Sequence, residues 1–272
     1  MLKFAAENGC AFDKTATGYA AQNGHAESLR FLLYEYKCTL CEHALIDACF
    51  YGHVACVQLL REFGVEWDGN ASVAAANGGH LSVLQHLHEN GCPWDEQVST
   101  IAAKNGNYDM LQYVLNHGGT YNPHLLTAAA RNVSENGLRC FKYLYEEMHM
   151  SVADATNSPF TEAFVHGNYY IVGYLLDRDP VYKQHAIVLP FLSQYYLEKR
   201  NVETDASYLA TIDSNLLKCI QCALEHDWDI DTCGGNLIEF LAKVCLRLPR
   251  SFECVKPWYE KRVSSNKRKE IV

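Results

Sequence analysis

Cysteine is the residue type in this sequence that most directly suggests chemistry. The 272-residue chain contains 12 cysteines. In the segment ENGCPWDE, at 89–96, a thiol at Cys92 lies close to several carboxylates in the sequence. A thiol becomes a nucleophile when a neighbouring base or positive charge lowers its pKa. A catalytic role for Cys92 therefore depends on the element that carries it.

Two CxxC pairs raise the separate question of a metal site. CTLC at 38–41 and CIQC at 219–222 have the spacing of zinc ligands. Cys38, Cys41 and His43 would supply three ligands at the first pair, with Cys49 as a distant fourth. Core packing is the preferred interpretation for both pairs, and zinc at 38–43 stays open as the alternative.

Other catalytic patterns are missing from the sequence. His86 and His88 are two residues apart, so they face different directions on a helix and do not form a metal-binding face with His80. The sequence contains no glycine-rich phosphate loop, GxSxG elbow or HExxH helix. We therefore predict no enzymatic activity, no cofactor and no metal.

The composition is that of a globular protein, with 49% hydrophobic and 20% charged residues. The net charge of -9 opposes binding to a phosphate backbone, so nucleic acid is not the expected partner. Apolar runs such as AIVLPFL are far shorter than the about 18–20 residues that span a bilayer, and no secretory signal is visible. We expect a cytoplasmic protein with reduced thiols. The basic tail KRVSSNKRKEIV leaves nuclear import open.

The elements that carry these residues repeat along the chain. A glycine followed by histidine or asparagine recurs at Gly24, Gly52, Gly79, Gly106 and Gly167, and Asn136 takes the glycine position in one unit. The intervals from 24 to 52, 79, 106, 136 and 167 are 28, 27, 27, 30 and 31 residues. Such regular spacing indicates an internal structural repeat.

Two further features follow the same interval. Small residues precede each glycine position, at Ala20-Ala21, Ala48-Cys49, Ala75-Ala76, Ala102-Ala103, Ala129-Ala130 and Ala163-Phe164. Apolar residues three apart follow it, at Leu29/Leu32, Val57/Leu60, Leu84/Leu87, Leu111/Val114, Phe141/Leu144 and Val172/Leu175. Each unit is therefore predicted to be a short alanine-rich helix, a glycine turn, a second helix and a loop. The histidine or asparagine after the glycine is predicted to cap the second helix.

The segment around Cys92 recurs as one of these loops. Its copies are NGCAFD at 8–13, FGVEWD at 63–68, NGCPWD at 90–95 and, more weakly, HGGTYN at 117–122. The small residue and the aromatic residue are predicted to point inward and seal the seam between units, and the acid to cap the next helix. Because Val65 takes the place of Cys92 in another copy, Cys92 is interpreted as a packing residue rather than a nucleophile.

These units resemble ankyrin repeats in their AAxNGH helix ends, their LxxL helices and their NGCPWD loops. The usual threonine-proline-leucine-histidine opening is absent, and the period is about 27 rather than about 33 residues. The NGCPWDE loop is similar to that of amoebal, oomycete and giant-virus ankyrin proteins. The resemblance implies an all-α, helical-hairpin solenoid with little or no β-hairpin fingers.

The same resemblance divides the chain into segments. We predict repeats over 1–180, the first of them partial, an irregular helical insertion at 181–204 and a degenerate repeat at 205–232. A helical C-terminal cap is predicted at 233–262 and a flexible basic tail at 263–272.

The resemblance also implies that another protein binds the concave face, formed by the first helix of each pair. The exposed positions of that face are Tyr19, Gln22, Asp47, Phe50, Tyr51, Asn77, Ile101, Lys104, Arg131, Glu162 and His166. Phe50 and Tyr51 stand out, because exposed aromatic residues are typical binding hot spots. The alternative is that Phe50 packs inward and Tyr51 is only partly exposed.

Two other functions remain open beside a binding scaffold. The segment LRLPRSF at 246–252 faintly resembles the start of an F-box, which would make the protein a substrate adaptor of a ubiquitin ligase. The protein could instead be a structural subunit of a larger assembly, held through the open seam of its partial first repeat and the irregular region at 180–206. The sequence does not name the partner, because repeat proteins place specificity in variable surface residues.

Overall fold

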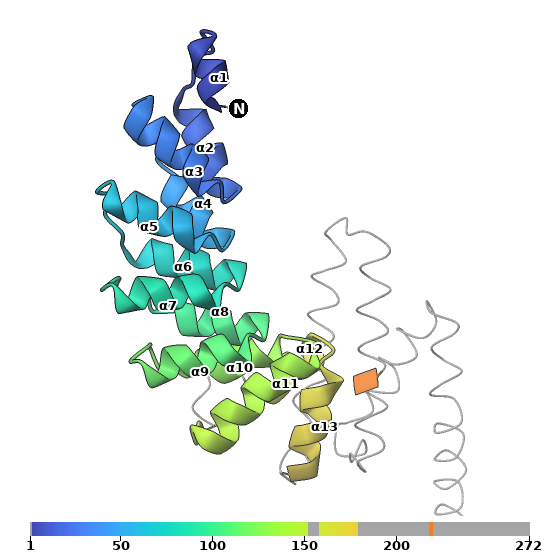
Figure 1. The fold of residues 1–272 in the computed structure, drawn as a ribbon. Coiled ribbons are helices and arrows are strands. Elements are labelled where there is room, and N and C mark those ends of the chain that lie inside the picture. Colours follow the sequence, from blue (N-terminus) through green and yellow to red (C-terminus); the bar gives the residue numbers. More distant parts are fainter. Residues whose placement is uncertain (1, 152–157, 179–217, 220–272) are drawn as a thin grey trace, which may run out of the picture. The chain divides into compact units, whose positions relative to one another are not determined.

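The structure is a computed structural model that describes residues 2–151, 158–178 and 218–219 (Figure 1). The described residues form helices and no strand, which confirms the all-α prediction. The helices are α1 (Leu2–Glu7), α2 (Lys14–Gln22), α3 (Ala26–Arg30), α4 (Ala44–Phe50), α5 (Val54–Glu62), α6 (Gly69–Gly78), α7 (Leu81–Glu89), α8 (Gln97–Asn105), α9 (Tyr108–Asn116), α10 (His124–Ala130), α11 (Glu135–Lys142), α12 (Pro159–Val165) and α13 (Tyr169–Arg178). Two π-helical turns, η1 (Phe31–Glu35) and η2 (Tyr143–Glu147), extend α3 and α11.

The chain divides into two compact units. The first consists of Met1–Ala129 with Lys142–Met150, and the second of Ala130–Phe141 with Ser151–Val272. The predicted insertion at 181–204, cap at 233–262, tail at 263–272 and F-box-like segment at 246–252 lie outside the described residues. The same holds for the degenerate repeat at 205–232, apart from residues 218 and 219.

Helical pairs follow one another through the first unit (Figure 1). The first helices form one row, in which α2 packs on α4, α4 on α6 and α6 on α8. The second helices form another row, in which α3 packs on α5 and α5 on α7. The predicted small pairs and LxxL positions are all buried. The small side chains allow the first helices to approach closely, because a Cβ on Gly78 would clash with the carbonyl oxygen of Phe50 on α4.

The turns between paired helices lie at the predicted glycines. Gly52 and Gly106 have φ angles of +84° and +69°, and Gly24, Gly79 and Gly167 are also left-handed. The prediction for Asn136 is wrong, because Asn136 lies inside α11. Here Ser134 accepts a hydrogen bond from the Gly137 backbone N–H at 3.2 Å, so the helix begins before Asn136. The regular spacing of the repeats predicted a turn at Asn136. The connection at 131–134 between α10 and α11 does not follow that spacing.

The two π-helical turns explain why some intervals exceed 27 residues. In the ordinary loops the N–H of Val65 bonds to the Leu60 carbonyl, five residues back, and that of Cys92 to the Leu87 carbonyl. After η1, Cys38 bonds to the Leu32 carbonyl, six residues back. The π turn therefore accommodates one extra residue in the second helix. CTLC at 38–41 is thus a further copy of the repeat loop, with Cys38 in the position of Cys92.

The second unit contains the helical pair α12 and α13, which pack on each other. Pro159 is the first residue of α12, where its missing N–H has no helical partner to lose. Phe160 and Phe164 are buried on one face of this helix. Val172 and Leu175 are buried on α13, as the LxxL pattern predicts.

Candidate binding surface

The acid at the end of each loop fixes the start of the next first helix. Asp13 accepts a hydrogen bond from the Thr15 N–H at 2.9 Å, and Asp68 accepts one from the Asn70 N–H at 2.9 Å. The same bond is made by Asp95 with Gln97 at 2.8 Å and by Asn122 with His124 at 2.9 Å. Hydrogen bonding to the Thr15 side chain and N–H also lowers the pKa of Asp13. The predicted capping role is confirmed for Asp13 and Asp68, the N-cap residues of α2 and α6, whereas Asp95 and Asn122 bond to the first residues of α8 and α10.

The loop aromatics contact the next unit, but they are not buried. The Trp94 indole N–H donates to the His117 carbonyl at 3.0 Å, and the Tyr121 hydroxyl donates to the Met148 carbonyl at 3.2 Å. Trp67 and Trp94 are half-buried, and Tyr121 is 51% exposed. The predicted inward direction is also wrong for Cys10, which is exposed. These aromatics lie over the rim of the seam, where the polar edge of the ring reaches a carbonyl.

Cys92 has the environment of a packing residue. Its side chain is buried, and its Sγ lies 3.3 Å from the Asp68 carbonyl oxygen. Burial raises the pKa of the Cys92 thiol to about 11 and that of the nearby Cys49 thiol to about 12. A nucleophilic cysteine requires the opposite shift. The interpretation of Cys92 as a core residue therefore agrees with its burial and protonation.

The two cysteines of the first CxxC pair occupy positions of the repeat loop and are not arranged as metal ligands. The Cys38 Sγ lies 3.6 Å from the Phe12 carbonyl oxygen, and the Cys92 Sγ lies 3.3 Å from that of Asp68, so each thiol contacts the preceding loop. Cys41 packs over Gly18, where a Cβ would lie 3.2 Å from the Cys41 Sγ. Across residues 2–151, 158–178 and 218–219, no three histidine, cysteine or acidic side chains gather as a metal site would require. In the second pair, CIQC, Cys219 is buried, and Cys222 lies outside those ranges.

The histidine or asparagine after each glycine reaches back to the preceding unit. His53 Nε2 lies 2.9 Å from the Gln22 carbonyl oxygen, and the Asn107 amide donates to the Gly79 carbonyl at 3.3 Å. His25, His53 and His80 begin their helices but make no side-chain cap, so the capping prediction is wrong for them. Asn107 does cap, accepting from the Met110 N–H at 3.2 Å. An imidazole is larger than an amide, and its ring lies against the glycine of the unit before it.

A set of buried hydroxyls joins the first helices to the loops, and sequence reasoning missed it. Its members are Thr17, Ser72 and Ser99, all at most 1% exposed. The Ser99 hydroxyl donates to the Thr120 carbonyl at 2.7 Å. Those of Thr17 and Ser72 accept from the N–H groups of Cys41 and Asp95, at 3.0 and 3.3 Å. Their separation by about one or two repeat intervals was a visible signal for this role.

The predicted surface residues of the first unit are accessible to different degrees. Tyr19 is 64% exposed, Phe50 is 42% exposed and Tyr51 is 44% exposed. Asn77 and Lys104 are also exposed, whereas Gln22, Asp47 and Ile101 are half-buried. The Phe50 and Tyr51 rings contact each other edge to face at 5.1 Å between centroids. Phe50 therefore does not pack into the core, and the alternative considered from the sequence is wrong.

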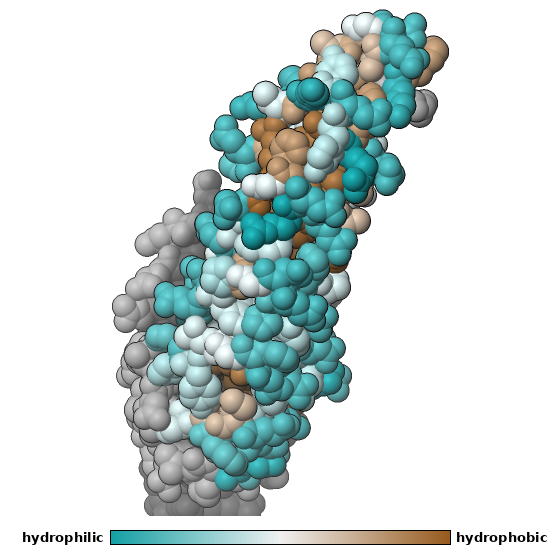
Figure 2. All heavy atoms as spheres, turned by 60° about the vertical axis from the view of Figure 1, so that its left-hand side comes forward, coloured by the Kyte–Doolittle hydropathy of each residue, from teal (hydrophilic) through white to brown (hydrophobic). Residues whose placement is uncertain are grey.

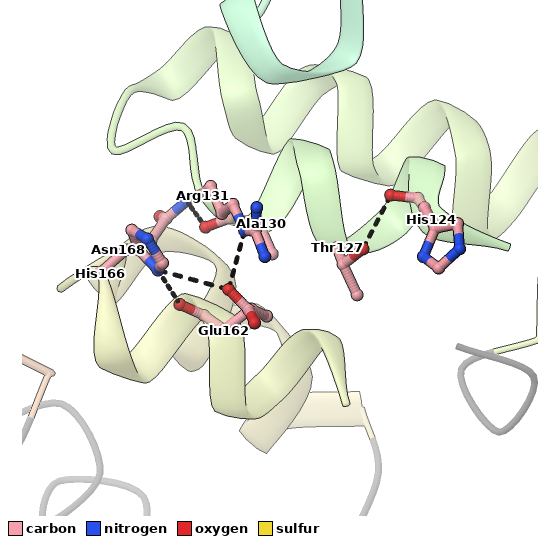
Figure 3. Close-up of polar contacts among 7 residues, drawn as sticks. All are labelled: His124, Thr127, Ala130, Arg131, Glu162, His166 and Asn168. Atoms are coloured by element: carbon pink, nitrogen blue, oxygen red, sulfur yellow. Dashed lines mark hydrogen bonds and ion pairs between the residues drawn. The ribbon is translucent and has the colours of Figure 1, made fainter. Parts of the chain in front are cut away.

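The remaining predicted residues lie in the second unit and interact with one another (Figure 3). The Arg131 guanidinium donates to the Glu162 carboxylate at 2.9 Å, and this bond raises the pKa of Arg131. His166 Nδ1 lies 3.5 Å from the same carboxylate. Beside them the Asn168 side-chain amide, fully buried, donates to the carbonyls of Ala130 and Asn132 at 3.1 and 2.7 Å. Glu162 is thus the centre of a local polar cluster.

A groove of about 650 Å³ opens between α4, α6 and the loop at 65–68. Two predicted surface residues, Phe50 and Asn77, line it. Sequence reasoning missed its remaining lining, because these residues come from three separate elements. Figure 2 shows that hydrophobic surface gathers at the level of α2 to α4, within a face that is otherwise mostly hydrophilic.

No protein-family model and no curated protein sequence matches the chain. The fold is similar to the crystal structure of the human ASB11 ankyrin repeat domain, with a TM-score of 0.49 and 22% sequence identity. The match covers 59% of this chain and 82% of that chain. None of the described helices is long and apolar enough to cross a bilayer.

Proposed function

We propose that this protein is a non-catalytic binding module, built from short-period ankyrin-like repeats, that holds another protein on its first helices. The supporting observation is the pair Phe50 and Tyr51, which are adjacent, in mutual ring contact and both more than 40% exposed. A folded domain gains stability by burying such rings, and exposed aromatic side chains are enriched among binding hot spots. The helix at whose end they lie, α4, packs closely on α6, whose start is capped by the Asp68 side chain.

The test is partner capture by the double variant Tyr51→Ala and Lys104→Glu. Tyr51 and Lys104 are exposed, so we expect the melting temperature to change by only a few degrees. The wild-type protein is immobilised and then incubated with extract from its native source. It should retain a partner, which mass spectrometry identifies. The affinity for that partner should fall at least about tenfold in the double variant.

A matched control replaces Glu89 and Glu27, which are exposed on second helices, with alanine. This control should retain the partner. Equal affinity of the wild type and the Tyr51/Lys104 variant would show that the first helices are not the binding face.

A further inference from the structure

We infer that the groove between α4 and α6 binds a short basic segment of a partner protein through one large apolar side chain. This inference rests on the proposed function, because it assigns a chemistry to the partner of the same surface. The groove has a volume within the range of about 300–1,000 Å³ typical of ligand sites. Its lining separates into an apolar floor and acidic residues.

The floor of this seam carries larger apolar side chains than the corresponding positions of the neighbouring units. Ile46 and Phe50 are four residues apart on α4 and both line the groove, as does Val73 on α6. One repeat later the positions of Val73 and Asn77 are taken by Thr100 and Lys104. One repeat earlier than Ile46 and Phe50, the residues are Gly18 and Gln22. The repeat fold therefore does not require apolar residues here, and partly exposed apolar residues that the fold does not require mark a binding site.

Every charged residue that lines the groove is acidic. These residues are Glu42, Glu66 and Asp68. Two cations lie nearby. Lys14 is 3.8 Å from Glu42 in an exposed pair, which solvent weakens, and Arg61 lies over the Trp67 ring at 4.5 Å. The chain as a whole carries a net charge of -9. Lysine or arginine beside the apolar anchor would therefore complement the charge of the groove.

The walls of the groove are held in place without a ligand. Asp68 accepts hydrogen bonds from the N–H and the side-chain amide of Asn70, at 2.9 and 2.8 Å, which fixes the loop to α6. The Arg61 guanidinium covers one face of Trp67, and His86 meets that ring edge to face at 6.3 Å between centroids. A preformed site loses little conformational entropy on binding, so a short segment can bind measurably.

The experiment measures fluorescence anisotropy of three labelled peptides with the full-length protein. The first peptide carries one phenylalanine between pairs of arginine. In the second, alanine replaces phenylalanine, and in the third, glutamate replaces arginine. We expect the first peptide to bind at least about tenfold more tightly than either of the others. Its affinity should also fall between about 0.05 and 0.5 M salt, because salt screens exposed charges.

Variants then locate the binding site. Val73→Thr with Phe50→Asn gives each of these two positions the residue found one repeat later, and Glu66→Lys reverses an exposed charge with no effect expected on folding. Each should weaken binding of the first peptide at least about tenfold. Glu89→Lys changes the net charge equally but lies outside the groove, so it should leave the affinity unchanged.

Three results would overturn the inference: equal binding of all three peptides, unchanged affinity in the Glu66→Lys variant, or an equal loss in Glu89→Lys. The proposed function fails separately. If the natural partner is lost on Tyr51→Ala with Lys104→Glu but the peptides do not bind, the stack binds proteins and the groove is not the site. If the peptides bind as expected but the double variant does not affect partner capture, the inference about the groove is supported. The proposal that the first helices form the binding face is then contradicted.

Discussion

Some single residues in this fold have two roles: they end a helix in their own helical pair, and they leave space for a side chain of the next pair. Gly52 ends α4 with a left-handed φ of +84°, and a Cβ at this position would lie 2.5 Å from the ring nitrogen Nδ1 of His80. Gly24 has the same relation to His53. The glycine-histidine pattern therefore reflects both backbone conformation and the space that the imidazole of the next unit requires.

Gly52→Ala should cost more stability than Gly64→Ala. Gly64 is also left-handed, at φ +94°, but nothing lies within 4 Å of its Cβ position. Each substitution adds left-handed strain of about 1–2 kcal/mol, and Gly52→Ala adds a steric clash of about 1–3 kcal/mol. Denaturant unfolding of both variants measures the difference. Adding His80→Ala should remove much of the extra cost at Gly52, and equal costs for the two alanine variants would exclude the clash.

The buried thiols predict how stability changes at alkaline pH. Unfolded thiols lose their proton near pH 9, whereas burial raises the pKa of Cys92 to about 11 and that of Cys49 to about 12. The unfolded state thus loses these protons first, so the contribution of the two thiols to the free energy of unfolding should be constant below about pH 9 and should fall above it. Cys92→Val should make this fall less steep. At neutral pH it should change stability by less than about 1.5 kcal/mol, because Val65 occupies the equivalent position. An identical pH profile for wild type and variant would contradict this account.

At the scale of elements, the sequence predicted the helices because their determinants are local. Alanine pairs, glycine turns, LxxL spacing and capping acids each lie within a few residues of the element that they define. The hydroxyl set of Thr17, Ser72 and Ser99 was missed because its partners lie in the next loop, more than twenty residues away. The histidine cap was wrong for the same reason, since the ring of His53 reaches the previous unit.

The π-helical turns show why a regular interval is not enough to align the units. Lys37 and His149 follow η1 and η2 with φ angles of +56° and +52°, where other loops use glycine. Without a glycine, and with one extra residue in the helix, the loop at 37–42 did not match the pattern. CTLC therefore resembled a metal motif in the sequence, although the structure shows it as one more repeat loop.

At the scale of the molecule, the position of the groove could not be predicted from any one repeat. It requires α4, α6 and the loop at 65–68 together, and its apolar floor depends on residues that differ between units. The repeats share the same backbone geometry, and exposed side chains that differ between units give one seam a different polarity and charge. The residues that recur explain the fold, and those that vary support the binding proposals.

The contact between α4 and α6 should control both the stability of the stack and the shape of the groove. A Cβ on Gly78 would clash with the Phe50 carbonyl oxygen, so Gly78→Ala must move these two helices apart. We expect a loss of at least about 2 kcal/mol in the free energy of unfolding. Because each pair in a linear array contacts only its neighbours, the loss should be local. Hydrogen exchange should therefore speed up in α4 and α6 and remain unchanged in α12 and α13.

Gly91→Ala is the matched control for that experiment, since its Cβ would meet nothing within 4 Å. It should lower stability through backbone strain alone and should leave exchange in α4 and α6 at the wild-type rate. Gly78→Ala should also weaken the basic peptide, because Ile46 and Phe50 on α4 would no longer lie at the same distance from Val73 on α6. Uniformly faster exchange through α2 to α13 would instead show that the described helices unfold as one cooperative body. In that case Gly78→Ala would destabilise all of these helices, and its effect on peptide binding could not be assigned to the groove alone.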